Sequence, residues 1–402
     1  MANVSSSNGI EKYPKLRFPE FTEPWTETQL TNLFKKNTKK NNDGSVTNVI
    51  SNSAKNGLIP QKDYFDKDIA NADNTAGYYI IRKNDFVYNP RKSTDAPYGP
   101  ISRYTYSDDG IVSPLYLCFR GNDNINPYYF EKYFKSSAWH RYIYMSGDRG
   151  ARHDRVSIKD ETFFEMPINL PCEYEQDKIA TFLSVLEHKI EKQAALVDNL
   201  KKYKRGVIRT IFNDNISFGK NVKLKEVACI YDGTHQTPEY TTQGVKFVSV
   251  ENIEDLLGSK KHISSMAFYK DFKVFPEAGN VLMTRIGDIG RAAYVNFSEK
   301  IAFYVSLALF KCSSKLNGEY LRHFICTDQF QKELWERTLH IAFPKKINTG
   351  EIGECHVVLP PINEQIKIAT ICSSIDKKIY LSEKELSLLQ FMKAGLQQQL
   401  FI

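Results

Sequence analysis

The chain of 402 residues lacks several features that would place it in a class at once. It has no run of about 18 or more apolar residues, so we expect no membrane-spanning helix and no membrane partner. The N-terminal segment lacks the apolar core of a signal peptide, which predicts that the protein is not secreted. The seven cysteines form no CxxC pair, so we predict reduced core thiols in the cytoplasm and neither a zinc site nor disulfides.

Signatures of enzyme sites are also lacking. No GxxxxGK(S/T) phosphate loop is present, which argues against an ATP-driven motor. Asn126-Pro127-Tyr128-Tyr129 is only partly like the (N/D)PP(Y/F) motif of adenine methyltransferases, because it lacks the second proline and no glycine-rich cofactor loop accompanies it. We interpret Asn126 as a helix N-cap, with Pro127 at the first helical position. We expect no catalytic residue, no metal site and no bound cofactor in this chain.

What the sequence does have is an ordinary globular composition with a modest positive charge. Apolar residues make up 42% and charged residues 25%, and the formal net charge is +7. The length predicts two domains or more. The charge permits an anionic partner without requiring one.

The most informative feature is an internal repeat. The segment from Leu170 to Phe212 recurs without a gap from Leu359 to Phe401, an offset of 189 residues, and both copies contain LP, EQ and KIAT. Both copies also carry a seam of residues spaced alternately three and four apart, as in a coiled coil. The apolar seam residues are Leu183, Leu186, Ile190, Val197, Leu200, Val207, Ile375, Ile379, Leu386, Leu389, Leu396 and Leu400.

Polar residues interrupt both seams at the same places. Gln193 and Ser382 occupy one equivalent position, and Lys204 and Lys393 occupy another. Polar seam residues usually cost stability and help to fix register or orientation. A helix of about 37 residues, at about 1.5 Å per residue, is roughly 55 Å long. We therefore expect two rods that pair with each other; the alternative is that each helix covers only its own domain.

The segments before the two helices predict two globular domains of unlike sequence. Both contain aromatic and β-branched runs broken by Gly, Pro, Asn and Asp, which is typical of strands joined by turns. Divergence between duplicated units is expected where each must bind something different. The expected order is a tail at 1–14, a first domain at 15–170, a helix at 171–213, a linker at 214–221, a second domain at 222–358 and a final helix at 359–402.

The LPxxxEQxxIA start of both helices resembles the two conserved regions of specificity subunits of type I restriction–modification enzymes. YPKLRFPEFTEPWTETQL near the N-terminus, GARHDR (150–155) and IYDGTHQTP (230–238) are similar to further segments of that family. The resemblance implies two α/β target recognition domains, and two long helices packed as an antiparallel coiled coil with pseudo-two-fold symmetry. It implies a non-catalytic subunit that reads a bipartite, asymmetric DNA target, with the helices setting the unread spacer.

The same resemblance implies the partners. They are double-stranded DNA, two methyltransferase subunits docked along the helices, and two restriction/translocase subunits. Adenine methylation and DNA cleavage, with S-adenosylmethionine, ATP and Mg²⁺, then belong to those partners.

Reading bases requires side chains such as Arg, Lys, Asn or Gln aimed at the groove edges, supported by phosphate contacts. In the first domain, the run from Gly147 to Arg155 places three arginines and a histidine among glycines. The candidates there are Arg91, Lys92, Arg103, Arg149, Arg152, His153 and Arg155. In the second domain, the glycine-rich segment TRIGDIGR (284–291) follows a strand pattern. The candidates there are Thr234, His235, Gln236, Arg285, Arg291, Lys345 and Lys346.

Some alternatives stay open. Each candidate loop is otherwise a plain solvated surface loop or hairpin. The whole chain is otherwise an adaptor whose two globular heads bind protein or carbohydrate. The basic cluster at the end of the first helix, with no acid nearby, is either a solvated helix C-terminus or a contact with spacer phosphates or a methyltransferase subunit; its members are Lys201, Lys202, Lys204, Arg205 and Arg209.

Overall fold

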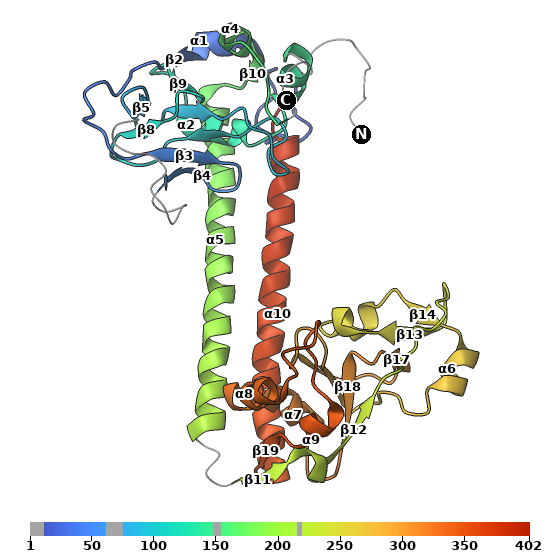
Figure 1. Ribbon diagram of the computed structural model, residues 1–402. Helices are drawn as coiled ribbons and strands as arrows, with labels where there is room; N and C mark the ends of the chain where they lie inside the picture. Colours follow the sequence, from blue (N-terminus) through green and yellow to red (C-terminus); the bar gives the residue numbers. More distant parts are fainter. Residues whose placement is uncertain (1–11, 62–74, 148–153, 215–218) are drawn as a thin grey trace. The chain divides into compact units, whose positions relative to one another are not determined.

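The computed structural model describes residues 12–61, 75–147, 154–214 and 219–402. The chain divides into two compact units: unit 1 comprises Met1–Gln193 and Glu385–Ile402, and unit 2 comprises Ala194–Lys384. Two long helices, α5 (Glu173–Arg209) and α10 (Ile362–Gln399), contribute to both units (Figure 1). Within the described residues, no helix combines the length and the apolar character needed to cross a membrane.

The globular part of unit 1 is built on a four-stranded antiparallel sheet. Its strands, in spatial order, are β2 (Phe34–Lys36), β9 (Leu117–Gly121), β6 (Phe86–Tyr88) and β7 (Ile101–Arg103). Two smaller antiparallel pairs accompany it: β3 (Ile50–Ser53) with β4 (Gly57–Pro60), and β5 (Tyr79–Ile81) with β8 (Gly110–Val112). The short helices are α1 (Leu30–Leu33), α2 (Pro127–Phe134), α3 (His140–Ser146) and α4 (Asp160–Phe164).

Unit 2 repeats this plan with a different sequence. Its four-stranded antiparallel sheet has the order β12 (Ala228–Asp232), β18 (Leu307–Cys312), β15 (Val281–Thr284) and β16 (Ala292–Tyr294). A second sheet contains β14 (His262–Ile263), β13 (Val245–Val248) and β17 (Ile301–Phe303). The helices are α6 (Ser265–Asp271), α7 (Gly318–Ile325), α8 (Asp328–Arg337) and α9 (Thr349–Gly353). The mixed helix–strand fold of both domains confirms the predicted α/β class.

The repeated LP and EQ dipeptides have a common structural role at the start of each long helix. A two-stranded pair precedes each helix: β1 (Thr26–Gln29) with β10 (Pro167–Leu170), and β11 (Lys220–Lys223) with β19 (His356–Leu359). The buried side chain of Gln176 donates from Nε2 to Pro171 O (2.9 Å), and Gln365 donates likewise to Pro360 O (2.9 Å). Each glutamine thus satisfies a carbonyl in the tight connection between strand and helix.

The seams predicted for the two helices are removed from solvent. In each unit, part of α5 lies beside part of α10 and the two run antiparallel, as predicted (Figure 1). Polar residues on other faces of the helices stay exposed. The buried seam residues are Leu183, Leu186, Val197, Ile379, Leu389 and Leu400, and the half-buried ones are Ile190, Leu200, Val207, Ile375, Leu386 and Leu396.

The two lysines that interrupt the seams make equivalent ion pairs. In unit 1, Lys393 Nζ lies 2.7 Å from Glu187 Oε1 on the facing helix. In unit 2, Lys204 Nζ lies 2.5 Å from Asp376 Oδ1 on the facing helix. The 189-residue offset relates both the lysines and the acids to each other. The pseudo-two-fold symmetry therefore extends from the sequence to these contacts.

Each of these acids also binds a cation from its neighbouring globular domain. Glu187 accepts a hydrogen bond from Lys132 of α2, and Asp376 accepts one from Arg322 of α7. Burial alone would raise the pKa of both carboxyls, but the cations outweigh this effect and hold both pKa values below the ordinary range. Each acid thus joins its own helix to the facing helix and to a domain.

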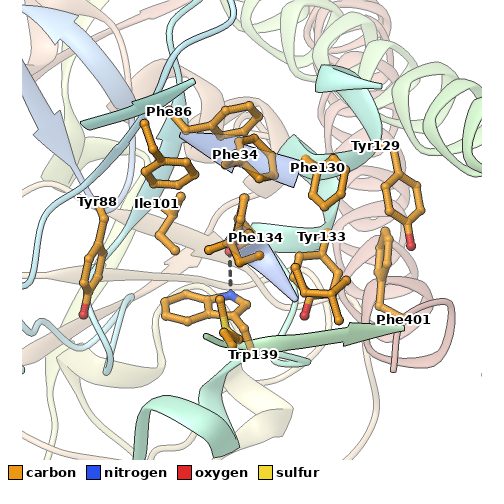
Figure 2. Close-up of a cluster of buried hydrophobic side chains, with 14 of the residues drawn as sticks. Phe34, Phe86, Tyr88, Ile101, Tyr129, Phe130, Tyr133, Phe134, Trp139 and Phe401 are labelled. Atoms are coloured by element: carbon orange, nitrogen blue, oxygen red, sulfur yellow. Dashed lines mark hydrogen bonds between the residues drawn. The ribbon is translucent and has the colours of Figure 1, made fainter. Parts of the chain in front are cut away.

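The C-terminal end of each long helical segment inserts an aromatic ring into a domain core. In unit 1, the ring of Phe401 lies 5.5 Å from that of Tyr129 and 5.9 Å from that of Tyr133 (Figure 2). In unit 2, the equivalent ring of Phe212 lies 5.6 Å and 5.7 Å from two rings of α7. Such aromatic contacts add to the stabilisation gained by burying apolar surface.

Three smaller predictions have mixed outcomes. Asn126 is the N-cap of α2, as predicted: its side chain accepts hydrogen bonds from two backbone N–H groups of the first turn. All seven cysteines are free, but the prediction of core thiols is wrong for Cys172, Cys229 and Cys326, which are exposed. Their backbone positions face solvent, a property that residue type does not reveal.

The prediction that no acid lies near the basic cluster of α5 is wrong. Lys201 contacts Glu383 of α10 at 2.7 Å, and Lys202 contacts Asp198 one turn earlier at 2.6 Å. Lys204 pairs with the half-buried Asp376 of α10 described above. Two of these acids belong to the facing helix, so the sequence of α5 alone does not show them.

The acid clusters generate a stability prediction. Glu187→Gln should lower the free energy of unfolding by about 3 kcal/mol, because it leaves Lys393 without its anion and leaves Lys132 with only the more distant carboxylate of Glu131, at 3.4 Å. The side chains of Lys132 and Lys393 are only 4% and 25% exposed. The solvent-exposed pair of Asp198 and Lys202 supplies the control, since Asp198→Asn should leave the free energy of unfolding almost unchanged. Calorimetric unfolding of both variants measures the difference.

The pH dependence checks the same cause. A carboxyl whose pKa is lowered in the folded state contributes stability above its unfolded pKa, and this stability is lost as the pH falls through the folded pKa. The difference in the free energy of unfolding between the wild type and Glu187→Gln should therefore be full above about pH 4.5 and shrink in more acidic solution. A gap that does not change with pH would contradict an ionic origin.

Candidate nucleic-acid interface

Three candidate segments of unit 2, far apart in sequence, meet around the guanidinium group of Arg285. This residue directly follows β15. Its Nη1 donates to Asp232 Oδ1 (2.8 Å) at the end of β12 and to Val305 O (3.2 Å), and its Nε donates to Ile347 O (3.0 Å). The side chain is only 7% exposed. Arg285 therefore ties the glycine-rich segment to the segment that begins IYDGTHQ and to the one that contains Lys345 and Lys346.

The glycine-rich segment forms a tight loop between β15 and β16. Thr284 N donates to Arg291 O (2.8 Å), and Arg291 N donates to Thr284 Oγ1 (3.0 Å), which closes the loop. Gly287 and Gly290 have φ values of 83° and 94°, in the left-handed region that other residues rarely adopt. A Cβ at Gly290 would also lie 2.6 Å from Gln331 Nε2. The loop therefore depends on both glycines, and it exposes the backbone of Gly287.

Lys345 and Lys346 lie against this loop. Gly287 N donates to Lys345 O (2.8 Å), and Lys346 forms a β-bridge with Ile286. Leu339 N donates to Lys346 O (2.8 Å), so the residues between them form a hairpin. Both lysine side chains are exposed. Two cations next to exposed backbone can contact phosphate groups.

The segment that contains Thr234, His235 and Gln236 approaches from β12. Gly233 packs so closely against the end of β17 that a Cβ at this position would lie 2.4 Å from Phe303 O. Thr234 is half-buried and donates from its hydroxyl to Gln236 O (3.2 Å), whereas His235 and Gln236 are exposed. His235 Nε2 lies 3.6 Å from the Asp232 carboxylate that holds Arg285.

Unit 1 has the same backbone arrangement at the equivalent place. Lys92 N donates to Asp154 O (2.8 Å), and Arg91 forms a β-bridge with Arg155. Val156 N donates to the carbonyl that precedes Arg91 (2.9 Å), just as Ile347 N donates to Arg285 O (3.0 Å) in unit 2. Arg91 and Lys92 are exposed, and Arg155 is half-buried. The candidates Arg149, Arg152 and His153 lie outside the described residues.

We call these two arrangements loop pair 1 and loop pair 2. Loop pair 1 joins residues 89–92, which follow β6, to residues 154–156. Loop pair 2 joins residues 285–291, which follow β15, to residues 339–347. Strands β6 and β15 hold the same place in the two four-stranded sheets, so both loop pairs rest on the same scaffold. Sequence reasoning selected residues from all four loops but did not predict that they would pair.

Two of the arginines predicted to contact DNA bind other residues of their own domain. Arg103 donates to Glu131 Oε2 (2.8 and 2.6 Å) and to Asn84 Oδ1 (2.8 Å), and its guanidinium group lies 4.4 Å from the centre of the Tyr128 ring. Its side chain, like that of Arg285, is 7% exposed. These internal partners do not support a direct DNA contact by either arginine, and we reassign both to positioning. Residue type alone does not distinguish an arginine that turns inward from one that reaches outward.

Two positioning residues were missed. Asp232 belongs to the segment IYDGTHQTP (230–238), from which the sequence analysis selected only Thr234, His235 and Gln236. Gln331 on α8 donates from Nε2 to Gly290 O (3.0 Å) and to Ile325 O (2.7 Å) and so fixes the glycine-rich loop. A single glutamine on a polar helix gives no sequence signal for this role. Among the described residues, no group of three His, Cys, Asp or Glu side chains is placed to hold a metal ion.

The inward position of Arg285 generates a prediction. Arg285→Ala should lower the free energy of unfolding by about 2–4 kcal/mol, because it leaves a carboxylate and two carbonyl oxygens without their donor. Arg291→Ala should lower the free energy of unfolding by less than about 1 kcal/mol, because the Arg291 side chain is 41% exposed. Calorimetry of both variants tests this, and equal losses would contradict the positioning role.

Comparisons with known proteins identify the family of this chain. The family described as type I restriction modification DNA specificity domain matches residues 23–201 and again residues 219–390. A curated relative, the specificity subunit of the type I restriction enzyme MjaVIII from Methanocaldococcus jannaschii, is 26% identical over 256 residues. That match covers 56% of this chain and 59% of the relative, which is less than two thirds of its length.

Solved structures share the fold. The S subunit of a type I restriction–modification system from M. genitalium superposes with a TM-score of 0.59 and 16% identity, over 97% of this chain and 99% of that one. A second solved structure, described as the structural basis of complex assembly and conformational transition of the type I R-M system, has a TM-score of 0.57 and 15% identity. The match covers 93% of this chain and 96% of that one. Since the two family matches together cover most of the sequence, the chain belongs to the type I restriction–modification DNA specificity domain family and contains two copies of the domain.

Proposed function

We propose that this chain is the DNA-reading subunit of a type I restriction–modification complex, and that each globular domain reads one half of a bipartite, asymmetric target. The observation that carries the proposal is the loop pair that both domains present on the same scaffold with different side chains. A shared scaffold with unlike loops is the pattern expected of two readers with different targets.

The exposed side chains of the loop pairs have the chemistry that a duplex requires. Lys92, Lys345 and Lys346 supply cations for phosphate groups, and the exposed backbone near Gly287 allows close approach. Arg91 and Gln236 carry the planar groups that bind base edges by paired hydrogen bonds. The buried Arg285 holds the two loops of loop pair 2 in place, so that less conformational entropy is lost on binding.

The unlike loops and the paired helices suggest the form of the target. Because the two loop pairs differ in sequence, the two half-sites should differ and the target should not be palindromic. Two domains that bind the same groove of one duplex must be separated by its helical repeat of roughly 34–36 Å or by a multiple of it. Stiff paired helices are suited to fixing such a spacing, whereas a flexible linker is not.

Exposed apolar side chains on the helices support two equivalent partner sites. In unit 1, Phe182 and Met392 are 40% and 44% exposed; in unit 2, the equivalent Ile371 and Tyr203 are 49% and 61% exposed. Exposed apolar surface commonly marks protein interfaces. We assign these faces to two methyltransferase subunits, and two restriction/translocase subunits would complete the complex. Catalysis, with S-adenosylmethionine, ATP and Mg²⁺, would then reside in the partners.

A domain exchange tests the proposal. Replacing residues 222–358 with the matching domain of a relative should change one half-site and leave the other half-site and the spacer intact. The exchange retains the first domain and the contacts between α5 and α10. Mapping adenine methylation in cells that express the hybrid with its partners measures the result. The reciprocal exchange of residues 15–170 is the matched control and should change the other half only. A change in both halves, or no methylation with the unaltered chain, would refute the assignment.

A further inference from the structure

The hairpin of loop pair 2 ends in two large apolar side chains that none of the described residues of unit 2 covers. Ile341 and Phe343 are 102% and 104% exposed, the values expected of an extended chain. Single exposed apolar residues are common, but two such large side chains at one loop tip present an apolar surface that a partner can cover.

The tip stands on an ordered base. Leu339 N donates to Lys346 O, and Gly287 N donates to Lys345 O, each at 2.8 Å. The next residue, Ile347, is fully buried, and its carbonyl accepts a hydrogen bond from Arg285 Nε. On the other side, the ring of His340 lies 4.7 Å from that of Trp335. The two apolar side chains therefore project from a fixed hairpin.

Two exposed lysines lie next to the tip. Lys345 and Lys346 are exposed and follow the apolar residues directly, and the exposed glycine-rich loop lies beside them. A duplex offers the matching surfaces, because phosphates lie on its outside and apolar base faces lie within the stack. Proteins that unstack DNA insert Phe, Leu, Ile, Met or Pro side chains between base pairs, and the tip has the sequence Ile341-Ala342-Phe343-Pro344.

The first domain has a different sequence at the equivalent place. Thr338 ends α8 and Gly147 ends α3, and pairing with the neighbouring loop resumes at Lys345 and Asp154. Between these points unit 2 has LHIAFP (339–344) and the first domain has DRGARH (148–153), which lies outside the described residues. A partner that met both domains alike would favour similar tips. The apolar tip is instead specific to the second domain, as a feature that selects one half-site would be.

We propose that Phe343, supported by Ile341, inserts between base pairs of the second half-site and partly unstacks them. The inference rests on the proposed DNA-reading function and adds a mechanism to it. The free-energy cost of unstacking depends on sequence and is lowest at pyrimidine–purine steps such as TA and CA/TG. The second half-site should therefore have such a step at the point of insertion, where the protein reads deformability rather than hydrogen-bond pattern.

The experiment uses the full chain in complex with its methyltransferase subunits. The probe is a duplex that carries the methylated target mapped in cells, with 2-aminopurine at one position of the second half-site at a time; this base fluoresces more strongly when unstacked. The wild-type complex should raise the fluorescence at one step. Phe343→Ala should abolish the rise and weaken binding to the target by about tenfold, within the range of base–aromatic stacking, while binding to random DNA stays unchanged.

Three variants separate this result from other causes. Phe343→Leu should keep part of the fluorescence rise, because leucine can also act as a wedge. Met266→Ala on α6 removes an equally apolar side chain, 81% exposed, and should behave as the wild type. Lys345→Ala should reduce the salt dependence of binding by about one counterion and retain the fluorescence rise.

Two outcomes would overturn the inference. One is a target complex that forms normally with no fluorescence change at any position. The other is a Phe343→Ala chain that binds DNA normally but loses its methyltransferase subunits, which would assign the tip to a protein contact. Failure of the proposed function gives a different result, since the wild-type complex would then not prefer the mapped duplex to random DNA.

Discussion

The carboxylates of Glu187 and Asp376 each join three elements of the fold. Each acid lies on one long helix, binds a lysine of the facing helix, and binds a cation of a globular domain. A carboxylate withdrawn from water is costly unless cations surround it, so sliding one helix by a turn would leave a partly buried carboxylate without the lysine of the facing helix. Apolar seams alone would tolerate such a slip more easily. These contacts therefore fix the register within each unit and hold each domain against the helix pair.

The two domains illustrate how one scaffold supports different chemistry. The same order of four strands and the same β-bridge between two loops recur, although few residues are shared. In unit 2, the buried guanidinium of Arg285 makes three internal hydrogen bonds that hold the loops of loop pair 2 in place. The outward side chains can then vary at little cost to folding.

The sequence predicted the parts of the structure that depend on local pattern. The seam at three and four residue intervals identified both helices and the residues between them, because helical periodicity is a property of one segment. The repeated LP and EQ dipeptides identified the helix starts, and Asn126 was correctly interpreted as a cap. The strand-rich domains followed from runs such as VKFVSV, which contains β13.

The rest depends on contacts between distant segments. The direction of Arg103 and Arg285 is decided by Glu131 and Asp232, acids that no spacing rule connects to them. The acid that pairs with Lys204 lies on the other helix, far along the chain. The pairing of the two loops in each domain arises from the order of strands in the sheet, which a single sequence does not reveal.

The hairpin tip of unit 2 has a consequence for how the protein can change over time. Its large apolar side chains contribute nothing to the core, while the hydrogen bonds at its base involve backbone atoms that every residue except proline can supply. Substitutions at the tip thus escape the stability threshold that filters most mutations. New preferences can arise there by single steps, each carried by a protein that still folds and assembles. Selection can then act on the tip almost independently of the rest of the chain.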